Sequence, residues 1–315
     1  MRKEITPGVY PTMITPFHED LSIDYEALKN LIEWYIHRGI DGLFAVCQSS
    51  AMFELSREER ASLCRSTVEY AGGRYPVMAS GHVSDTIEGQ IDDLQAMADS
   101  GADALVLVSN RLAAPWENDS KWLKNLNRLL KKLPTDIPLG FYECPYPYKR
   151  VLSIELVKEL IGMNRFEFIK DTCCDPPMIK KRAALSKGSK VQFFNANAAT
   201  LLMSLKEGYA GYSGIMTNFH SDLYYRLCHD WQEMGEDAQS LQDYLGLASV
   251  IECQFYPANA RYSLVKEGVL NNLVSRRQDA RLRQLTKSQE MEVDQFYAIS
   301  QEMSNRYKRK EQPGG

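Results

Sequence analysis

The chain has 315 residues, of which 44% are hydrophobic and 25% are charged, the composition of a folded globular protein rather than a disordered one. Its 37 Lys and Arg residues and 41 Asp and Glu residues leave a formal net charge of −4, which excludes a general electrostatic attraction to nucleic acid. No apolar run reaches the roughly 18 residues that a membrane-spanning helix needs, and the N-terminus lacks the apolar core of a secretory signal. We therefore expect a cytoplasmic protein that binds neither membranes nor nucleic acids.

Eight short apolar runs alternate with amphipathic segments along the first two-thirds of the chain. Val, Ile, Leu, Phe and Tyr fill several runs almost continuously, as in strands that are buried on both faces of a parallel sheet. The predicted strands are residues 9–15, 42–47, 76–81, 104–109, 137–143, 166–171, 190–195 and 211–215.

Amphipathic helices are predicted between these strands. Asp24 precedes the first helix, whose apolar residues recur at spacings of three and four from Leu28 to Ile36. Ser56 and Asp85 each stand three residues before a glutamate, the spacing of a capping box at a helix start. Further helices are predicted at residues 120–132, 153–162, 177–186, 198–207 and 221–234.

Three helix-to-strand junctions share one form, which indicates an internal repeat. Gly39, Gly101 and Gly208 each stand where a helix ends, just before an apolar run. Eight such units in about 225 residues match a (β/α)8 TIM barrel in number and length. The competing doubly wound sheet is disfavoured because the chain has neither a Gly-x-Gly-x-x-Gly motif nor a phosphate-loop motif.

We therefore predict an α/β fold with three parts. A TIM barrel that carries the active site covers residues 1–225, and a C-terminal helical extension covers residues 226–310. The extension has predicted helices at residues 241–253, 257–268 and 288–307, and residues 311–315 are predicted to form a flexible tail.

Two reactive side chains end neighbouring strands. Reactive groups of a TIM barrel come from the C-terminal strand ends, where Tyr142 closes the fifth run and Lys170 closes the sixth. Burial can lower the pKa of a lysine to roughly 7–8 and leave an amine that attacks ketones, while a phenol can shuttle protons. Alternatively, Lys170 reaches solvent or pairs with Asp171, and Tyr142 is an ordinary core aromatic.

The segment after the second predicted strand contains Gln48, Ser49 and Ser50. Small hydroxyl residues with exposed backbone N–H groups before a helix suit a carboxylate. A plain loop with a helix cap is the alternative interpretation.

Several segments, taken in order, resemble the dihydrodipicolinate synthase / N-acetylneuraminate lyase family. They are residues 8–17, 24–28, 39–43, 54–60, 101–104, Phe141-Tyr142-x-x-Pro145 and Phe168-Ile169-Lys170-Asp171. The resemblance implies a TIM barrel with a helical C-terminal domain that assembles as a dimer or tetramer. It also implies a class I aldolase in which Lys170 forms a Schiff base with pyruvate or another 2-oxo acid and Tyr142 relays protons. Substrate contacts are expected from Gln48, Ser49, Ser50, Asn195 and Ile215, and no cofactor or metal is expected.

The chain departs from this family at several positions. Gln48 replaces a hydroxyl residue that often belongs to the proton relay, and an amide cannot pass a proton in that way. Residues 109–113 lack the tyrosine that synthases contribute to a neighbouring subunit, and Pro147 stands where synthases carry a substrate-binding arginine. We therefore expect aldol cleavage or condensation by a divergent member rather than standard dihydrodipicolinate synthase activity. The alternative is a barrel that binds oxo acids without catalysis because it has lost the relay.

The seven cysteines show no regular spacing, which favours reduced thiols over a disulfide framework. Cys47, Cys144, Cys173 and His82 all follow predicted strands and so face the same barrel mouth. Cysteine and histidine are zinc ligands, so a metal-dependent hydrolase is a third hypothesis. Because no Cys-x-x-Cys pair is present, chance placement of these residues is the preferred interpretation.

Overall fold

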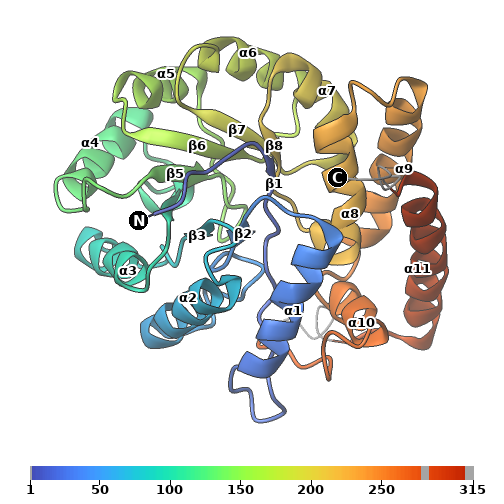
Figure 1. Cartoon of the computed structure of the whole chain (residues 1–315). Helices are drawn as coiled ribbons and strands as arrows, with labels where there is room; N and C mark the ends of the chain where they lie inside the picture. Colours follow the sequence, from blue (N-terminus) through green and yellow to red (C-terminus); the bar gives the residue numbers. More distant parts are fainter. Residues whose placement is uncertain (1, 278–283, 309–315) are drawn as a thin grey trace.

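The computed structural model describes residues 2–277 and 284–308, in which eight parallel strands are surrounded by helices (Figure 1). The hydrogen-bonded order is β1-β8-β7-β6-β5-β4-β3-β2. Between β1 and β2, Thr12 pairs in parallel with Phe44, and the Phe44 N–H donates to Pro11 O at 3.0 Å. The predicted (β/α)8 fold is confirmed. The strands are β1 (Gly8–Val9), β2 (Leu43–Phe44), β3 (Val77–Ala79), β4 (Ala104–Val108), β5 (Leu139–Tyr142), β6 (Phe166–Asp171), β7 (Gln192–Asn195) and β8 (Gly211–Tyr212).

One helix follows each strand around the barrel. These helices are α1 (Tyr25–Arg38), α2 (Arg57–Ala71), α3 (Ile87–Asp99), α4 (Asp119–Leu130), α5 (Ile154–Gly162), α6 (Pro176–Ser186), α7 (Leu201–Glu207) and α8 (Thr217–Asp230). Two short 3-10 turns, η1 (Ser109–Arg111) and η2 (Ala198–Thr200), follow β4 and β7.

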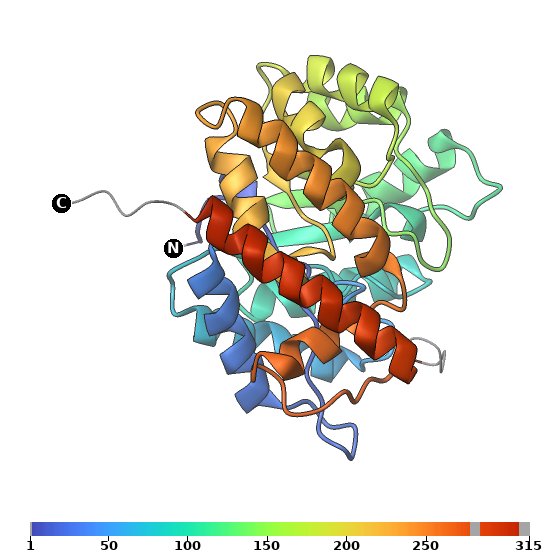
Figure 2. The ribbon, with the colours of Figure 1, turned by 90° about the vertical axis from the view of Figure 1, so that its right-hand side faces the viewer.

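Three further helices pack on one side of the barrel. They are α9 (Glu236–Cys253), α10 (Ala258–Lys266) and α11 (Lys287–Tyr307), and all three contact α8. Figure 2 shows α11 running across this side beside α9, with α10 near α1. The predicted boundary at residue 225 lies inside α8, and the predicted tail at residues 311–315 lies outside the described residues.

The predicted elements differ from the observed ones mainly at their ends. Strand β1 is shorter than the predicted residues 9–15, because Pro11 has no N–H to donate to a ladder. Thr86 rather than Asp85 caps α3, since its side chain accepts the Gly89 N–H. Helix α8 begins at Thr217 instead of residue 221 and is kinked at His220, whose φ is −149°.

The glycine junctions have the predicted geometry. Gly39, Gly101 and Gly208 have φ values of 94°, 89° and 108°, a region that disfavours other residues. Two residues after Gly39 and Gly101, aspartates bind strand backbones: Asp41 accepts the Val9 N–H of β1 at 2.8 Å, and Asp103 accepts the Val77 N–H of β3 at 2.8 Å. Within the described ranges, no helix has the length and apolar content to cross a membrane.

Candidate active site

The lysine and the tyrosine at the ends of β6 and β5 lie side by side inside the barrel. Tyr142 and Lys170 are register partners on the two parallel strands, and both side chains are buried. The Lys170 Nζ lies 4.7 Å from the centroid of the Tyr142 ring and 5.8 Å from that of Phe44. The two residues therefore converge as the strand pattern predicts.

The amine of Lys170 has an apolar environment. Burial lowers the pKa of Lys170 from 10.5 to about 8, and the nearby thiols of Cys47 and Cys144 oppose this shift. No carboxylate of the described chain pairs with this amine; Asp171 points outward and lies 2.8 Å from Arg182. The alternative of a Lys170–Asp171 pair is therefore wrong, and the amine can lose its proton near neutral pH.

The residues after Tyr142 and Lys170 point out of the barrel and meet one buried arginine. Arg182 of α6 lies 2.6 Å from Glu143 and 2.8 Å from Asp171, and all three side chains are buried. Burial raises the pKa of Glu143, whereas the Arg182 guanidinium, despite burial, holds the pKa of Asp171 below its usual value. This triad joins the ends of β5 and β6 from outside and so holds Tyr142 beside Lys170.

The loop after β2 brings Gln48 to the hydroxyl of Tyr142. The Tyr142 O–H donates to Gln48 Oε1 at 3.3 Å, and the Cys144 thiol contacts the same oxygen at 3.6 Å. Burial raises the pKa of Tyr142 well above its ordinary value, so the phenol keeps its proton at neutral pH. The Gln48 amide oxygen therefore accepts this hydrogen bond at the position where a proton relay would need a second hydroxyl group.

The two serines of this loop have different environments. Ser50 is fully buried, and its Oγ lies 2.7 Å from the Met13 carbonyl and also contacts the Ala45 carbonyl. These bonds shape the loop, so the geometry does not support the predicted substrate contact of Ser50. Ser49 makes no such bond to a carbonyl of the described chain; burial raises the pKa of Tyr256, a residue from outside the loop, and the Ser49 side chain opposes this rise.

Two backbone N–H groups of the same loop are available to a ligand. The Ser50 and Met52 N–H groups donate to the Cys47 carbonyl at 3.1 and 3.3 Å. Those of Gln48 and Ser49 donate to no acceptor within the described chain. Adjacent free N–H groups of this kind suit an anion such as a carboxylate.

Tyr256 lies near the C-terminal end of β1, and our reasoning from the sequence did not identify it. It lies in the segment between α9 and α10, and its hydroxyl accepts a hydrogen bond from Asn218 Nδ2 at 3.1 Å. The same Asn218 Nδ2 lies 3.0 Å from the carbonyl of Thr12, which follows β1. The only signal was its position next to the predicted helix 257–268, which does not show that the segment folds back over the barrel.

Two predicted substrate contacts, Asn195 and Ile215, have no observed link to the Lys170 amine. Asn195 points outward from β7, where its Nδ2 donates to Thr200 Oγ1 at 3.0 Å and to Ser204 Oγ at 2.9 Å. The geometry therefore does not support Asn195 as a substrate contact. Ile215 is partly buried against the apolar cluster formed with α7, α8 and α9, and its contact with substrate stays a prediction.

The four residues of the predicted metal site, Cys47, Cys144, Cys173 and His82, do not form one cluster. The Nδ1 of His82 accepts the Val108 N–H at 2.9 Å, and its Nε2 lies 3.0 Å from Gln90 Oε1. Burial lowers the pKa of His82 to about 4, so it is a neutral structural residue. Cys173 is partly exposed and contacts the Asp175 carbonyl, so only the other two cysteines flank Lys170. The described ranges contain no group of three or more His, Cys, Asp or Glu residues suited to a metal.

The loops after β4 and β5 bind each other. Asn110 donates to the carbonyls of Cys144 and Tyr146 at 2.8 and 2.9 Å. Arg150 lies 2.9 Å from Asp119 and also donates to two carbonyls of the β4–α4 loop. Arg150, which stands three residues after Pro147, is therefore engaged away from Lys170.

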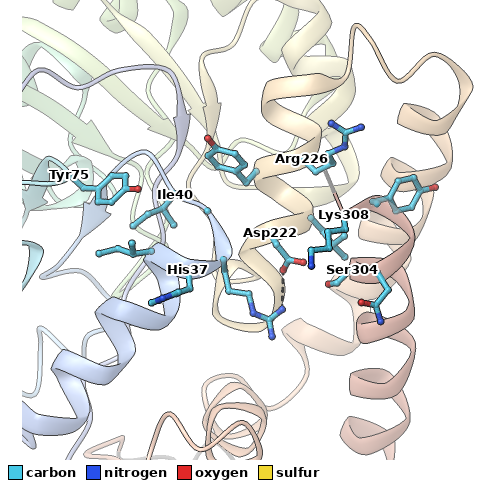
Figure 3. A pocket seen from close by; sticks show the side chains of 14 residues that line it. His37, Ile40, Tyr75, Asp222, Arg226, Ser304 and Lys308 are labelled. Carbon is cyan, nitrogen blue, oxygen red and sulfur yellow. Dashed lines mark hydrogen bonds and ion pairs between the residues drawn. The ribbon is translucent and has the colours of Figure 1, made fainter. Parts of the chain in front are cut away.

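A separate pocket of about 640 Å³ lies at the opposite end of the barrel (Figure 3). Figure 3 shows Ile40 and Tyr75 on one side of this pocket and Asp222 and Ser304 on the other. Its Arg38 is paired with Asp222 at 3.1 Å. Because reactive groups of a TIM barrel lie at the other end, we assign the candidate site to the residues around Lys170.

The sequence and the fold both resemble known proteins. A model of the dihydrodipicolinate synthetase family matches residues 6–301. The 4-hydroxy-tetrahydrodipicolinate synthase of Shewanella sp. (strain MR-7) is 26% identical over 268 residues, which cover 84% of this chain and 88% of that protein.

Two solved structures share the fold. The chloride-inhibited dihydrodipicolinate synthase of Acinetobacter baumannii, complexed with pyruvate, has a TM-score of 0.83 at 20% identity and covers 94% of this chain and 99% of its own. CdNal from Clostridium difficile, in complex with mannosamine, has a TM-score of 0.83 at 15% identity and covers 94% of this chain and 100% of its own.

Proposed function

The chain belongs to the dihydrodipicolinate synthetase family, a family of lyases, and on this premise we propose that Lys170 forms a Schiff base with pyruvate or another 2-oxo acid. The resulting adduct would undergo aldol cleavage or condensation. The observation that carries the proposal is the buried Lys170 amine, whose pKa is lowered to about 8 and which has no carboxylate partner in the described chain.

The reaction begins at this amine. The neutral Nζ of Lys170 attacks the ketone carbon and gives a carbinolamine, which loses water to form the imine. The Tyr142 hydroxyl is the nearby group that can donate a proton to the departing oxygen. The free N–H groups of Gln48 and Ser49 are suited to hold the carboxylate of the oxo acid.

We further propose that the second substrate differs from that of a standard dihydrodipicolinate synthase. The loop after β4 has no tyrosine, and Asn110 binds it to the next loop. Arg150 is paired with Asp119, so it is not free to bind the carboxylate of a second substrate in this conformation.

One observation favours a second function, the binding of an oxo acid without turnover. The Tyr142 hydroxyl donates to the side-chain oxygen of Gln48, which cannot pass the proton on. An imine could then form, but the later proton transfers would be slow. Exchange of the methyl protons of pyruvate in D₂O separates the two functions, because exchange requires the imine to lose a proton and form an enamine.

Reductive trapping tests the proposal. Wild-type protein and Lys170→Ala are incubated with pyruvate and borohydride, and their intact masses are measured. We expect one reduced pyruvate adduct on the wild type and none on the variant. Equal adducts on both proteins, or no adduct on either, would contradict the proposal.

From the family resemblance, we also propose a cytoplasmic homo-oligomer of two or four copies. Light scattering of the purified protein gives the mass in solution and separates these states from a monomer. A monomeric mass at all concentrations would reject this part of the proposal.

A further inference from the structure

We propose that Arg261 of α10 is the cation of an anion-binding site at the C-terminal end of the barrel strands and that its ligand is a carboxylate. The carboxylate belongs either to a free small acid or to the 2-oxo acid substrate. The site goes beyond the proposed Schiff-base function, because it derives from the burial of Arg261, from its unused N–H groups and from its hydrogen bonds.

The described chain buries three arginine side chains, and two of them are paired with carboxylates. Arg60 lies 2.9 Å from Asp93, and Arg182 lies 2.6 Å from Glu143. Arg261 is 2% exposed and forms no ion pair within the described residues. Burial lowers the pKa of Arg261 to about 10, so the guanidinium stays charged at neutral pH. Because an unpaired buried charge is costly, we infer that the counter-charge of Arg261 comes from a ligand.

The guanidinium of Arg261 has N–H groups that remain available. Its Nη2 donates to the Thr15 carbonyl at 2.6 Å. Its Nε and Nη1 are buried and have no hydrogen-bond partner among the described residues. The Phe17 ring, whose centroid lies 5.6 Å from the Arg261 Cζ, attracts the cation but accepts no N–H in the way that a carboxylate does. A carboxylate supplies both the negative charge and the acceptor oxygens that this guanidinium lacks.

Hydrogen bonds connect Arg261 to the loop after β2. Thr15, whose carbonyl binds Arg261, donates through its Oγ1 to the Ser50 carbonyl at 2.8 Å. The two residues before Ser50, Gln48 and Ser49, are those whose N–H groups donate to no acceptor within the described chain. Thr15 and this loop follow the C-terminal ends of β1 and β2. The site therefore lies at the same end of the barrel as Lys170.

The arginines that follow α10 are already paired in this region. The Arg276 guanidinium lies over the same aromatic ring as Arg261, 5.0 Å from its centroid, and 2.6 Å from Glu59. Arg277 donates to a carbonyl of the loop after β2 at 3.0 Å and lies 3.2 Å from Glu54. Both nearby carboxylates are therefore engaged, and the charge of Arg261 is left over.

Thermal unfolding in the presence of sodium acetate tests this inference. Melting temperatures of wild type, Arg261→Met and Arg261→Lys are measured over a wide range of acetate concentrations. Acetamide is the neutral analogue of acetate. Met removes the charge and keeps an extended side chain, whereas Lys keeps the charge. Arg128→Met is the control for general effects of salt, because Arg128 forms an exposed ion pair.

A carboxylate that binds only the folded protein should raise the wild-type melting temperature by about 3 °C per tenfold increase in acetate above its dissociation constant. Arg128→Met should show the same rise, Arg261→Lys part of it and Arg261→Met none. Acetamide should shift none of the proteins.

A parallel titration with pyruvate distinguishes the two sources of the carboxylate. Shifts with acetate and pyruvate that persist in Lys170→Ala but not in Arg261→Met would support a site for free carboxylates. A shift with pyruvate alone, absent from both variants, would support a site for the carboxylate of the substrate bound at Lys170. If reductive trapping at Lys170 fails while the acetate shift depends on Arg261, the Schiff-base function is rejected and the anion site stands. Absence of a wild-type shift with both ligands, or equal shifts in wild type and Arg261→Met with both ligands, would overturn the assignment of Arg261.

Discussion

Lys170 and Tyr142 are register partners on β6 and β5, and the lysine Nζ lies 4.7 Å from the centroid of the tyrosine ring. A cation over an aromatic face is stabilised, whereas burial disfavours the charged amine. Burial outweighs the opposing effects, so the pKa of Lys170 falls to about 8. The thiols of Cys47 and Cys144 limit this fall, and Tyr142 lies beside the amine as a phenol that can donate a proton.

The rate of pyruvate trapping should depend on pH through Lys170. Only the neutral amine attacks the ketone, so the rate should fall about tenfold per pH unit below pH 8 and level off above it. Initial rates with cyanoborohydride between pH 6 and 11 measure this profile. Tyr142→Phe keeps the ring and should keep the same midpoint. A midpoint near 10.5, the ordinary pKa of lysine, would contradict the burial that we describe.

Lys170→Met should stabilise the protein at pH 7. The buried lysine is hard to protonate, and the difference between its folded and unfolded pKa values corresponds to about 3 kcal/mol of unfolding free energy. Between pH 8 and 10.5 the unfolded lysine holds a proton that the folded one lacks, so wild-type stability rises with pH there. The advantage of Lys170→Met in urea unfolding should therefore be full below pH 8 and shrink toward pH 10.5. A pH-independent difference between the two proteins would argue against a lowered pKa.

Arg182→Met should strongly destabilise the protein, because it leaves Glu143 and Asp171 buried without their cation. Breaking a buried pair by removing one partner costs about 3–5 kcal/mol. Arg128→Met is the control, since Arg128 and Glu88 form an exposed pair at 3.4 Å, and such pairs contribute about 1 kcal/mol or less. Denaturant unfolding of both variants measures the difference. Similar losses in the two variants would show that the triad does not hold the strand ends.

Gln48→Thr should accelerate proton transfer in the bound oxo acid. The threonine hydroxyl can exchange protons with Tyr142, which the amide cannot do, and a positioned proton-transfer group contributes about 10²–10⁴-fold. The readout is exchange of pyruvate methyl protons in D₂O, followed by NMR. Gln48→Ala removes the amide without adding a hydroxyl and should not reproduce the gain. Equal exchange in both variants would mean that Gln48 limits access rather than proton transfer.

The convergence of Tyr142 and Lys170 could be predicted because it depends only on strand order and on which residue ends each strand. Asn195 also ends a strand, but its side chain faces outward, in register with Asp171. The predicted strands ended at Asp171 and Asn195, as β6 and β7 do, so strand alternation already indicated that the Asn195 side chain faces outward, opposite to Lys170. His82 follows a strand as well, yet it bonds to Gln90 inside the protein.

Contacts between distant segments could not be predicted. Tyr256 accepts a hydrogen bond from Asn218 at 3.1 Å because the segment between α9 and α10 folds back toward the barrel. No local sequence pattern indicates that this segment folds back toward the barrel. The sequence likewise does not distinguish Arg182 from other helix residues. Its pairs with Glu143 and Asp171 follow only from the packing of α6 against β5 and β6.

Peptide mapping of the trapped adduct tests the central claim most directly. Wild-type protein is reduced with borohydride in the presence of pyruvate, digested and analysed by tandem mass spectrometry, with Lys149, the exposed lysine in the loop after β5, as the internal comparison. The account predicts that the modification lies on Lys170 and that Lys149 stays unmodified. Modification of Lys149 or of other surface lysines, with Lys170 unmodified, would contradict it.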